Sequence, residues 1–252
     1  MAQSVSSQAT AGDWRNSKKW FTHETWFLKL VQTLLRIYYY PQLKIEKTGF
    51  ENVPTGPAIL VANHISGHDP TLMGISFPKG RFIYPMAKKE LFERSEWVMR
   101  HLGTFPIYRG GVDEWAFDHV GQILTAGQIC TIYAEGSRSG KKKAQLRRAK
   151  TGAARLAVRY QVPVLPCAII GTEKLATRKQ LKGWRPITIR LTLGKLIDVP
   201  SIVPEEPANQ RVYRELADEI MYRLALLLPE QYRGFYIKRR PVTHLQHVLG
   251  NS

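Results

Sequence analysis

The chain has 252 residues, 44% of them apolar, which suffices for one globular domain with its own core. Lys and Arg number 37 and Asp and Glu number 20, so the net charge of +17 predicts an anionic partner. No run approaches the roughly 18 apolar residues of a membrane-spanning helix, and residues 1–12 lack the basic start and apolar block of a secretory signal.

The N-terminal part divides into two segments. Residues 1–12 are small and polar and are predicted to be disordered. Residues 13–40 are predicted to hold an amphipathic helix from about Glu24 to Tyr39, preceded by interleaved aromatic and basic residues that suit a membrane–water interface. A helix that packs this face on the main domain explains the pattern equally well. The apolar positions at helical spacing are Phe27, Leu30, Val31, Leu34, Leu35 and Tyr38.

Strands and helices alternate through residues 41–229, which are predicted to form the main domain. The apolar run at 58–62 is a predicted strand, and a helix is expected from about Pro70. Further strands are expected at 81–84, 104–108, 129–133, 162–170 and 187–193, and further helices at 91–102, 112–126, 147–160 and 210–228. This alternation predicts an α/β fold in which helices cover a largely parallel central sheet. Residues 230–252 are left as a basic tail.

The first candidate site follows the strand at 58–62, in the sequence Asn-His-Ile-Ser-Gly-His-Asp-Pro at residues 63–70. Asp69 before a proline is typical of a helix N-cap, which places His64 in the preceding loop. A loop allows the Asp69 carboxylate to accept a hydrogen bond from one imidazole nitrogen and leaves the other nitrogen as a proton acceptor. His64 is therefore a candidate general base, and Asp69 is its candidate orienting partner.

Two other interpretations of this motif remain open. Asp69 serves only as a helix cap in the first, with His64 an ordinary loop residue. In the second, His64 and His68 bind zinc, but a four-residue spacing suits two ligands only on a continuous helix. Gly67 and Pro70 argue against such a helix, and the glutamate of the metalloprotease helix is absent. We therefore predict no metal.

The second candidate site follows the strand at 129–133, in the sequence Glu-Gly-Ser-Arg-Ser at residues 135–139. Gly136 lets the chain turn closely round a ligand, and Arg138 can hold two phosphate oxygens at once. Arg109, at the end of another strand, and Lys150 are further candidates for an anion site. Together the candidate substrate-binding residues are Arg109, Glu135, Gly136, Ser137, Arg138 and Lys150.

Basic residues concentrate in the second half of the chain. Residues 135–198 contain sixteen basic and three acidic residues, which leaves nucleic acid, an anionic membrane face or a phosphorylated substrate as possible partners. A solvated basic face is the alternative without any ligand. A nucleic-acid-binding protein is the rival from another functional class, but no aromatic stacking motif, zinc pattern or helix-turn-helix signature accompanies the charge. We predict no nucleic-acid partner.

Taken together, the motifs resemble those of the glycerolipid acyltransferases, the family typified by 1-acyl-sn-glycerol-3-phosphate acyltransferase. The order and spacing of the blocks agree over about residues 45–200. Ser137 stands where threonine is more usual, and Cys167 follows the last block where an aliphatic residue is common. The four blocks of the family correspond to residues 63–69, 103–109, 135–139 and 162–166.

The resemblance implies transfer of a fatty acyl group from acyl-CoA or acyl carrier protein to the sn-2 hydroxyl of lysophosphatidic acid, which gives phosphatidic acid in phospholipid biosynthesis. Glycerol 3-phosphate or another lyso-lipid is the alternative acceptor. The family resemblance also implies that His64 and Asp69 promote direct attack of the acceptor hydroxyl on the thioester without any cofactor. A peripheral enzyme on an anionic membrane surface at the cytoplasmic face is expected, and Cys130 and Cys167 in apolar runs predict buried thiols in a reducing compartment.

Overall fold

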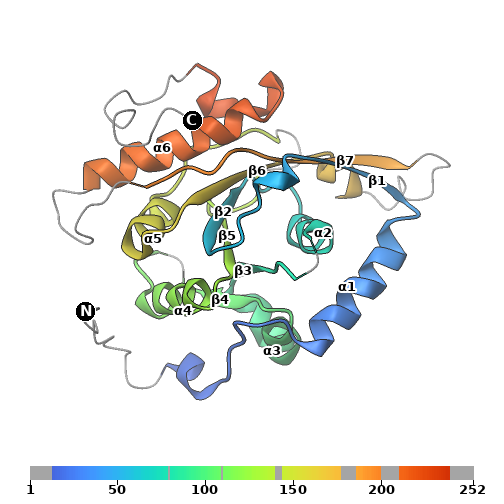
Figure 1. Ribbon diagram of the computed structural model, residues 1–252, viewed down its shortest axis with the longest axis vertical. Helices are drawn as coiled ribbons and strands as arrows, with labels where there is room; N and C mark the ends of the chain where they lie inside the picture. Colours follow the sequence, from blue (N-terminus) through green and yellow to red (C-terminus); the bar gives the residue numbers. More distant parts are fainter. Residues whose placement is uncertain are drawn as a thin grey trace.

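A seven-stranded sheet organises the fold (Figure 1). The computed structural model describes residues 13–78, 80–108, 110–139, 144–176, 186–199 and 210–238. The strand order is β1-β7-β6-β2-β5-β3-β4, and only β6 and β7 pair antiparallel. The predicted α/β fold with a largely parallel sheet is therefore confirmed. The strands are Leu43–Thr48 (β1), Ala58–Ala62 (β2), Ile83–Lys88 (β3), Phe105–Ile107 (β4), Ile129–Tyr133 (β5), Val164–Ile170 (β6) and Ile187–Leu193 (β7).

Helices cover both faces of the sheet (Figure 1). All five residues of β2 are buried, because side chains alternate between the faces of a strand and both faces carry a helical layer. Ile59 and Val61 face the layer of α4, α5 and α6, whereas Leu60 packs on the side of α2. The helices are Trp26–Tyr39 (α1), Asp69–Ser76 (α2), Phe92–His101 (α3), Glu114–Thr125 (α4), Gly152–Tyr160 (α5) and Gln210–Leu226 (α6).

The register between β2 and β5 brings the two sequence motifs together. The strands are adjacent and parallel, and Ala62 lies opposite Tyr133. The segments that follow these two strands carry His64 and Glu135. Both segments therefore leave the sheet at its carboxyl-terminal side, where the parallel strands end. The Asn63 side chain also ties this loop to the end of β6, because it donates to the Ile169 carbonyl at 2.9 Å and accepts from the Ile169 amide at 2.8 Å. Sites in open α/β sheets commonly form at the carboxyl ends of the strands.

Two parts of the structure differ from the sequence-based expectation. The helix expected from Arg147 begins only at Gly152, because tertiary hydrogen bonds hold the preceding residues: the Arg147 amide donates to Glu135 and the Lys150 amide donates to the Ala134 carbonyl. Strand β1 was missed, since it lies at the sheet edge and has only one fully buried residue.

Several expectations lie wholly or partly outside the described residues. These expectations are the disorder of residues 1–12, the anion-binding role of Arg109, and the part of the predicted tail at residues 239–252. Residues 230–238, which had been left as the start of a tail, form two 3₁₀ turns, and Tyr236 within them is 1% exposed.

Candidate active site

His64 and Asp69 form a hydrogen-bonded pair in the loop between β2 and α2. The His64 Nδ1 atom lies 2.8 Å from Asp69 Oδ2, and Asp69 is fully buried. The same carboxylate oxygen accepts from the amides of Ile65 at 2.7 Å and Ser66 at 2.8 Å. The carboxylate is thus fixed by the loop that it supports. An imidazole that donates from Nδ1 carries its lone pair on Nε2, where it can accept a proton.

The expected capping role of Asp69 is wrong. Asp69 is the first residue of α2, and the N-cap position is occupied by His68, whose side chain makes no capping bond. The carboxylate turns back toward the loop instead, because it satisfies the two loop amides as well as His64.

His68 points to a different partner from His64. Its Nδ1 atom lies 2.7 Å from the Tyr39 hydroxyl at the end of α1. Among the residues that the structure describes, no three His, Cys, Asp or Glu side chains are placed to hold a metal ion.

Glu135 joins the second motif to the first. Its Oε1 atom accepts from the His64 amide at 3.4 Å, and its Oε2 atom accepts from the amide of Arg147 at 3.1 Å and from its Nε at 3.3 Å. Burial raises the pKa of Glu135, although these hydrogen bonds act in the opposite direction. Ser139 adds a second link, because its amide and hydroxyl both donate to the His64 carbonyl. The geometry makes Glu135 a support for the loop of His64.

The residues after Glu135 form a turn beside two cations. Gly136 has φ +73°, and a Cβ there would lie 3.2 Å from the Lys150 side chain, so glycine permits their close approach. The Ser137 hydroxyl and carbonyl both accept from Arg147 Nη2. Arg138 and Lys150 are exposed, and neither side chain makes an ion pair or hydrogen bond with another described residue.

A cavity of about 810 Å³ joins these groups. His64, Lys88, Arg138 and Lys150 line it, so one part of the wall combines the imidazole with cations. The remaining wall is largely apolar and includes buried core side chains from the sheet and from the helical layer of α4 and α5. These apolar lining residues include Met86, Ile107, Phe117, Ile132 and Leu156.

Two functional contacts were not foreseen from the sequence. The Tyr133 ring stacks on His64, with centroids 4.1 Å apart and planes inclined by 22°. Tyr133 ends β5 and lies opposite Ala62 of β2, a pairing that neither strand sequence reveals alone. Arg147, which holds Glu135, gave no comparable signal because it was expected to lie in a helix.

The outer face of α1 is apolar and exposed. The face toward α2 buries Gln32 and Tyr39, whereas Trp26 is 70% exposed and Ile37 is 67% exposed. Phe27 contacts the half-exposed Trp97 of α3, which extends the apolar surface. No helix within the described ranges is long and apolar enough to cross a bilayer. The exposed apolar face consists of Trp26, Leu30, Leu34, Ile37 and Tyr38.

Comparisons with known proteins identify the family of this chain. The acyltransferase family model matches residues 44–170, just over half of the chain. A probable 1-acyl-sn-glycerol-3-phosphate acyltransferase of Mycoplasma pneumoniae is 27% identical over 81% of this chain and 78% of its own length. The chloroplastic 1-acyl-sn-glycerol-3-phosphate acyltransferase LPAT1 of Arabidopsis thaliana is 32% identical over 55% of this chain, which spans only 39% of that relative.

A solved structure shows the same fold. The crystal structure of the 1-acyl-sn-glycerophosphate acyltransferase of Thermotoga maritima superposes with a TM-score of 0.56 and 24% identity, over 77% of this chain and 76% of that one. The family model confirms the resemblance seen in the sequence motifs. The chain belongs to the acyltransferase family.

Proposed function

We propose that this protein transfers a fatty acyl group from an acyl thioester to the sn-2 hydroxyl of lysophosphatidic acid, which yields phosphatidic acid for phospholipid synthesis. The observation that carries the proposal is the cavity that joins an acid-paired imidazole, a largely apolar wall, and the cations Arg138 and Lys150, whose side chains have no ion pair or hydrogen bond among the described residues. A phosphate requires the cations, and an acyl chain requires the apolar wall. The names of the relatives support this acceptor.

In the proposed reaction His64 Nε2 removes the proton from the acceptor hydroxyl. The alcohol oxygen then attacks the thioester carbonyl, the carbon–sulfur bond breaks, and the proton passes to the departing thiolate. Asp69 holds the imidazole and stabilises the imidazolium that forms between these steps, as its 2.8 Å contact with Nδ1 permits. General-base assistance of this kind contributes roughly 10²–10⁴ in rate.

The acceptor phosphate is assigned to the cations at the edge of the sheet. Arg138 and Lys150 both line the cavity with no protein counter-charge among the described residues, so they are available to an anion. Gly136 and Ser137 shape the turn between them. Arg109, which lies outside the described residues, keeps its proposed role by analogy with the family. Glu135 is assigned a supporting role, because its carboxylate is occupied by His64 and Arg147.

Attachment to an anionic membrane surface at the cytoplasmic face is part of the proposal. The exposed apolar face of α1 supports it, since such faces insert at the boundary between headgroups and acyl chains. The net charge of +17 adds attraction to anionic lipids. Attachment of this kind places the enzyme at the surface in which its proposed acceptor resides.

The test is acylation by the purified protein of lysophosphatidic acid, glycerol 3-phosphate, other lyso-lipids and monoacylglycerol. Each acceptor is supplied with acyl-CoA and, separately, with acyl carrier protein loaded with the same chain. We expect phosphatidic acid as the main product, and monoacylglycerol, which lacks the phosphate, as a poor acceptor. Faster turnover of a phosphate-free acceptor contradicts the assigned anion site, and no product with any acceptor contradicts the function.

A further inference from the structure

The C-terminal segment Glu230–Tyr236 lies along the loop that precedes α5. The Leu146 amide donates to the Tyr232 carbonyl at 2.9 Å, and the Phe235 amide donates back to the Leu146 carbonyl at 2.9 Å. Both main-chain groups of Leu146, which is 3% exposed, are therefore satisfied by this segment. Residues far apart in the sequence thus share a two-way backbone contact.

Side chains extend the contact along the same loop. The Tyr236 hydroxyl accepts from the Ala149 amide at 3.0 Å and donates to Asp218 at 2.9 Å. The Gln145 side chain donates to the Gln231 carbonyl at 3.1 Å. Because residues 145, 146 and 149 are all held, the segment fixes the loop on either side of Arg147.

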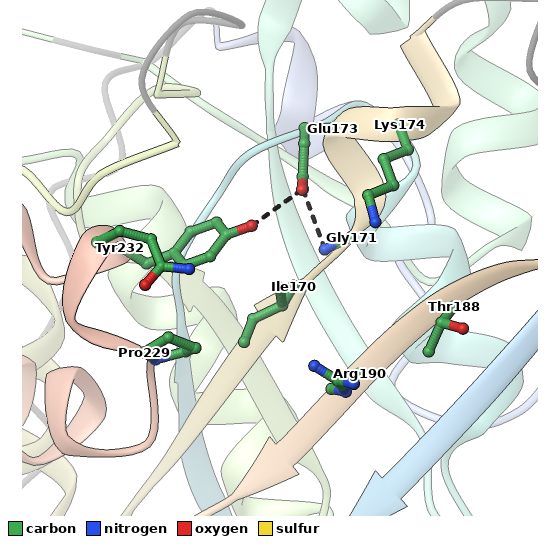
Figure 2. Close-up of a pocket in the computed structure, with 9 residues that line it drawn as sticks. Ile170, Gly171, Glu173, Lys174, Thr188, Arg190, Pro229 and Tyr232 are labelled. Atoms are coloured by element: carbon green, nitrogen blue, oxygen red, sulfur yellow. Dashed lines mark hydrogen bonds between the residues drawn. The ribbon is translucent and has the colours of Figure 1, made fainter.

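The segment is itself tied to the end of β6. Figure 2 shows the Tyr232 hydroxyl directed at Glu173, which it meets at 3.0 Å, while the other oxygen of Glu173 accepts from the Gly171 amide at 3.0 Å. Gly171 directly follows β6, so the C-terminal segment bridges a strand of the central sheet and the loop before α5.

The loop so held carries groups of the proposed anion site. Arg147 binds Glu135 and Ser137, and the Lys150 amide donates to the Ala134 carbonyl at 2.8 Å. Glu135 in turn accepts from the His64 amide. A displacement of the loop therefore moves Lys150 and removes the support of the turn that carries Arg138.

We propose that the segment Glu230–Tyr236 positions the anion site for the acceptor, and that Gly234 is its critical residue. This inference rests on the proposed function and deepens it. Gly234 has φ +47°, and a Cβ on it would lie 2.3 Å from the Leu146 carbonyl oxygen and 3.0 Å from the Gln145 Cβ. The first distance is shorter than real Cβ contacts and the second is tighter than most of them, so a side chain at this position pushes the loop away from the segment.

The test compares Gly234→Ala with Gly127→Ala. Gly127 also has a positive φ, of +73°, but a Cβ there meets nothing within 4 Å, so this control carries the backbone strain without the contact. We expect Gly234→Ala to raise the KM for lysophosphatidic acid roughly five- to tenfold with an unchanged KM for the acyl donor. Gly127→Ala should leave both values unchanged. A purely structural defect lowers the active fraction, and hence kcat, without altering one KM selectively.

A second variant guards against a folding failure of Gly234→Ala. Tyr236→Phe removes the bonds of the hydroxyl to the Ala149 amide and to Asp218 without any steric clash, and it should raise the same acceptor KM by a smaller factor. Unchanged acceptor KM in both variants, or a rise confined to the donor KM, overturns the inference.

Binding of glycerol 3-phosphate, followed by calorimetry, separates this inference from the proposed function. Weaker binding to Gly234→Ala than to Gly127→Ala supports the positioning role even if the protein has no acyltransferase activity. Equal binding, together with an active parent enzyme and an unchanged acceptor KM, overturns the positioning role while the proposed function stands.

Discussion

The ring of Tyr133 stacks on the imidazole of His64 on the side of β5, with the ring centroids 4.1 Å apart. His64 is thus fixed by two contacts of different kinds, since Asp69 holds Nδ1 and Tyr133 covers a ring face. An aromatic face also stabilises a cation above it. The stacked ring therefore favours the imidazolium that the proposed general-base step generates.

Replacement of Tyr133 should lower turnover through the loss of this face. We expect Tyr133→Leu to reduce kcat by roughly tenfold, the effect of one cation–π contact of about 1 kcal/mol together with a less ordered imidazole. Tyr133→Phe is the control, because burial raises the pKa of Tyr133 and its hydroxyl has only a weak contact of 3.9 Å to Met73. The measurement is kcat of both variants at saturating concentrations of the two substrates. Equal kcat for the Leu and Phe variants contradicts a role for the ring.

Removal of Arg147 should weaken binding of the acceptor at the proposed anion site, although Arg147 itself is not assigned a contact with the substrate. Arg147→Ala leaves the buried Glu135 carboxylate with backbone donors alone and releases Ser137, so we expect a severalfold higher acceptor KM. Arg148→Ala is a matched control, because Arg148 is also exposed and its side chain forms no hydrogen bond or ion pair with another described residue. The KM for lysophosphatidic acid of the two variants is the measurement. If Arg148→Ala shifts it as much as Arg147→Ala, general surface charge accounts for the effect.

Polar substitutions on the exposed face of α1 should detach the protein from membranes. Trp26 and Ile37 are the most exposed apolar side chains of this face, and Trp26→Ser with Ile37→Ser should weaken binding to anionic vesicles by about tenfold or more. Thr33→Ser, on the same helix, is the control. Cosedimentation with vesicles that contain phosphatidic acid measures the binding. Retention of wild-type binding by the double variant implies that this face has another partner.

His119 should make the fold sensitive to acid. Burial lowers its pKa to about 4, in contact with the rings of Trp115 and Phe105. The unfolded chain binds this proton below pH of about 6.5 and the folded chain only below about 4, so stability is complete above 6.5 and falls as the pH approaches 4. Between pH 7.5 and 4.5 the loss is on the order of 2 to 3 kcal/mol. Urea unfolding should show that His119→Phe escapes this part of the loss, whereas an identical pH dependence rejects the assignment.

The sequence revealed those features that depend on local pattern. Strands β2 and β5 were predicted because a strand buried on both faces leaves a nearly continuous apolar run, which Thr131 alone interrupts in β5. The pairing of His64 with Asp69 was also predicted, because the two residues share one short loop. Local pattern failed for Asp69 as a cap, since an aspartate before a proline serves equally well as a carboxylate that turns back over its loop.

Contacts between distant segments could not be predicted. The stacking of Tyr133 on His64 depends on the register of β2 against β5, which neither strand reveals alone. The region before α5 has strong helix formers, yet its backbone bonds to Glu135, Ala134 and the C-terminal segment outweigh that preference. The support of the anion site was therefore invisible until these segments were placed together.

In the proposed reaction His64 accepts the proton of the acceptor hydroxyl, so turnover by the His64→Ala variant is the decisive measurement. The variant is assayed with lysophosphatidic acid and the better of the two donors, beside a thermal unfolding measurement. We predict a fall in kcat of about 100-fold or more, with the acceptor KM and the melting temperature close to those of the parent protein. A folded variant that retains the parent kcat rules out His64 as the general base.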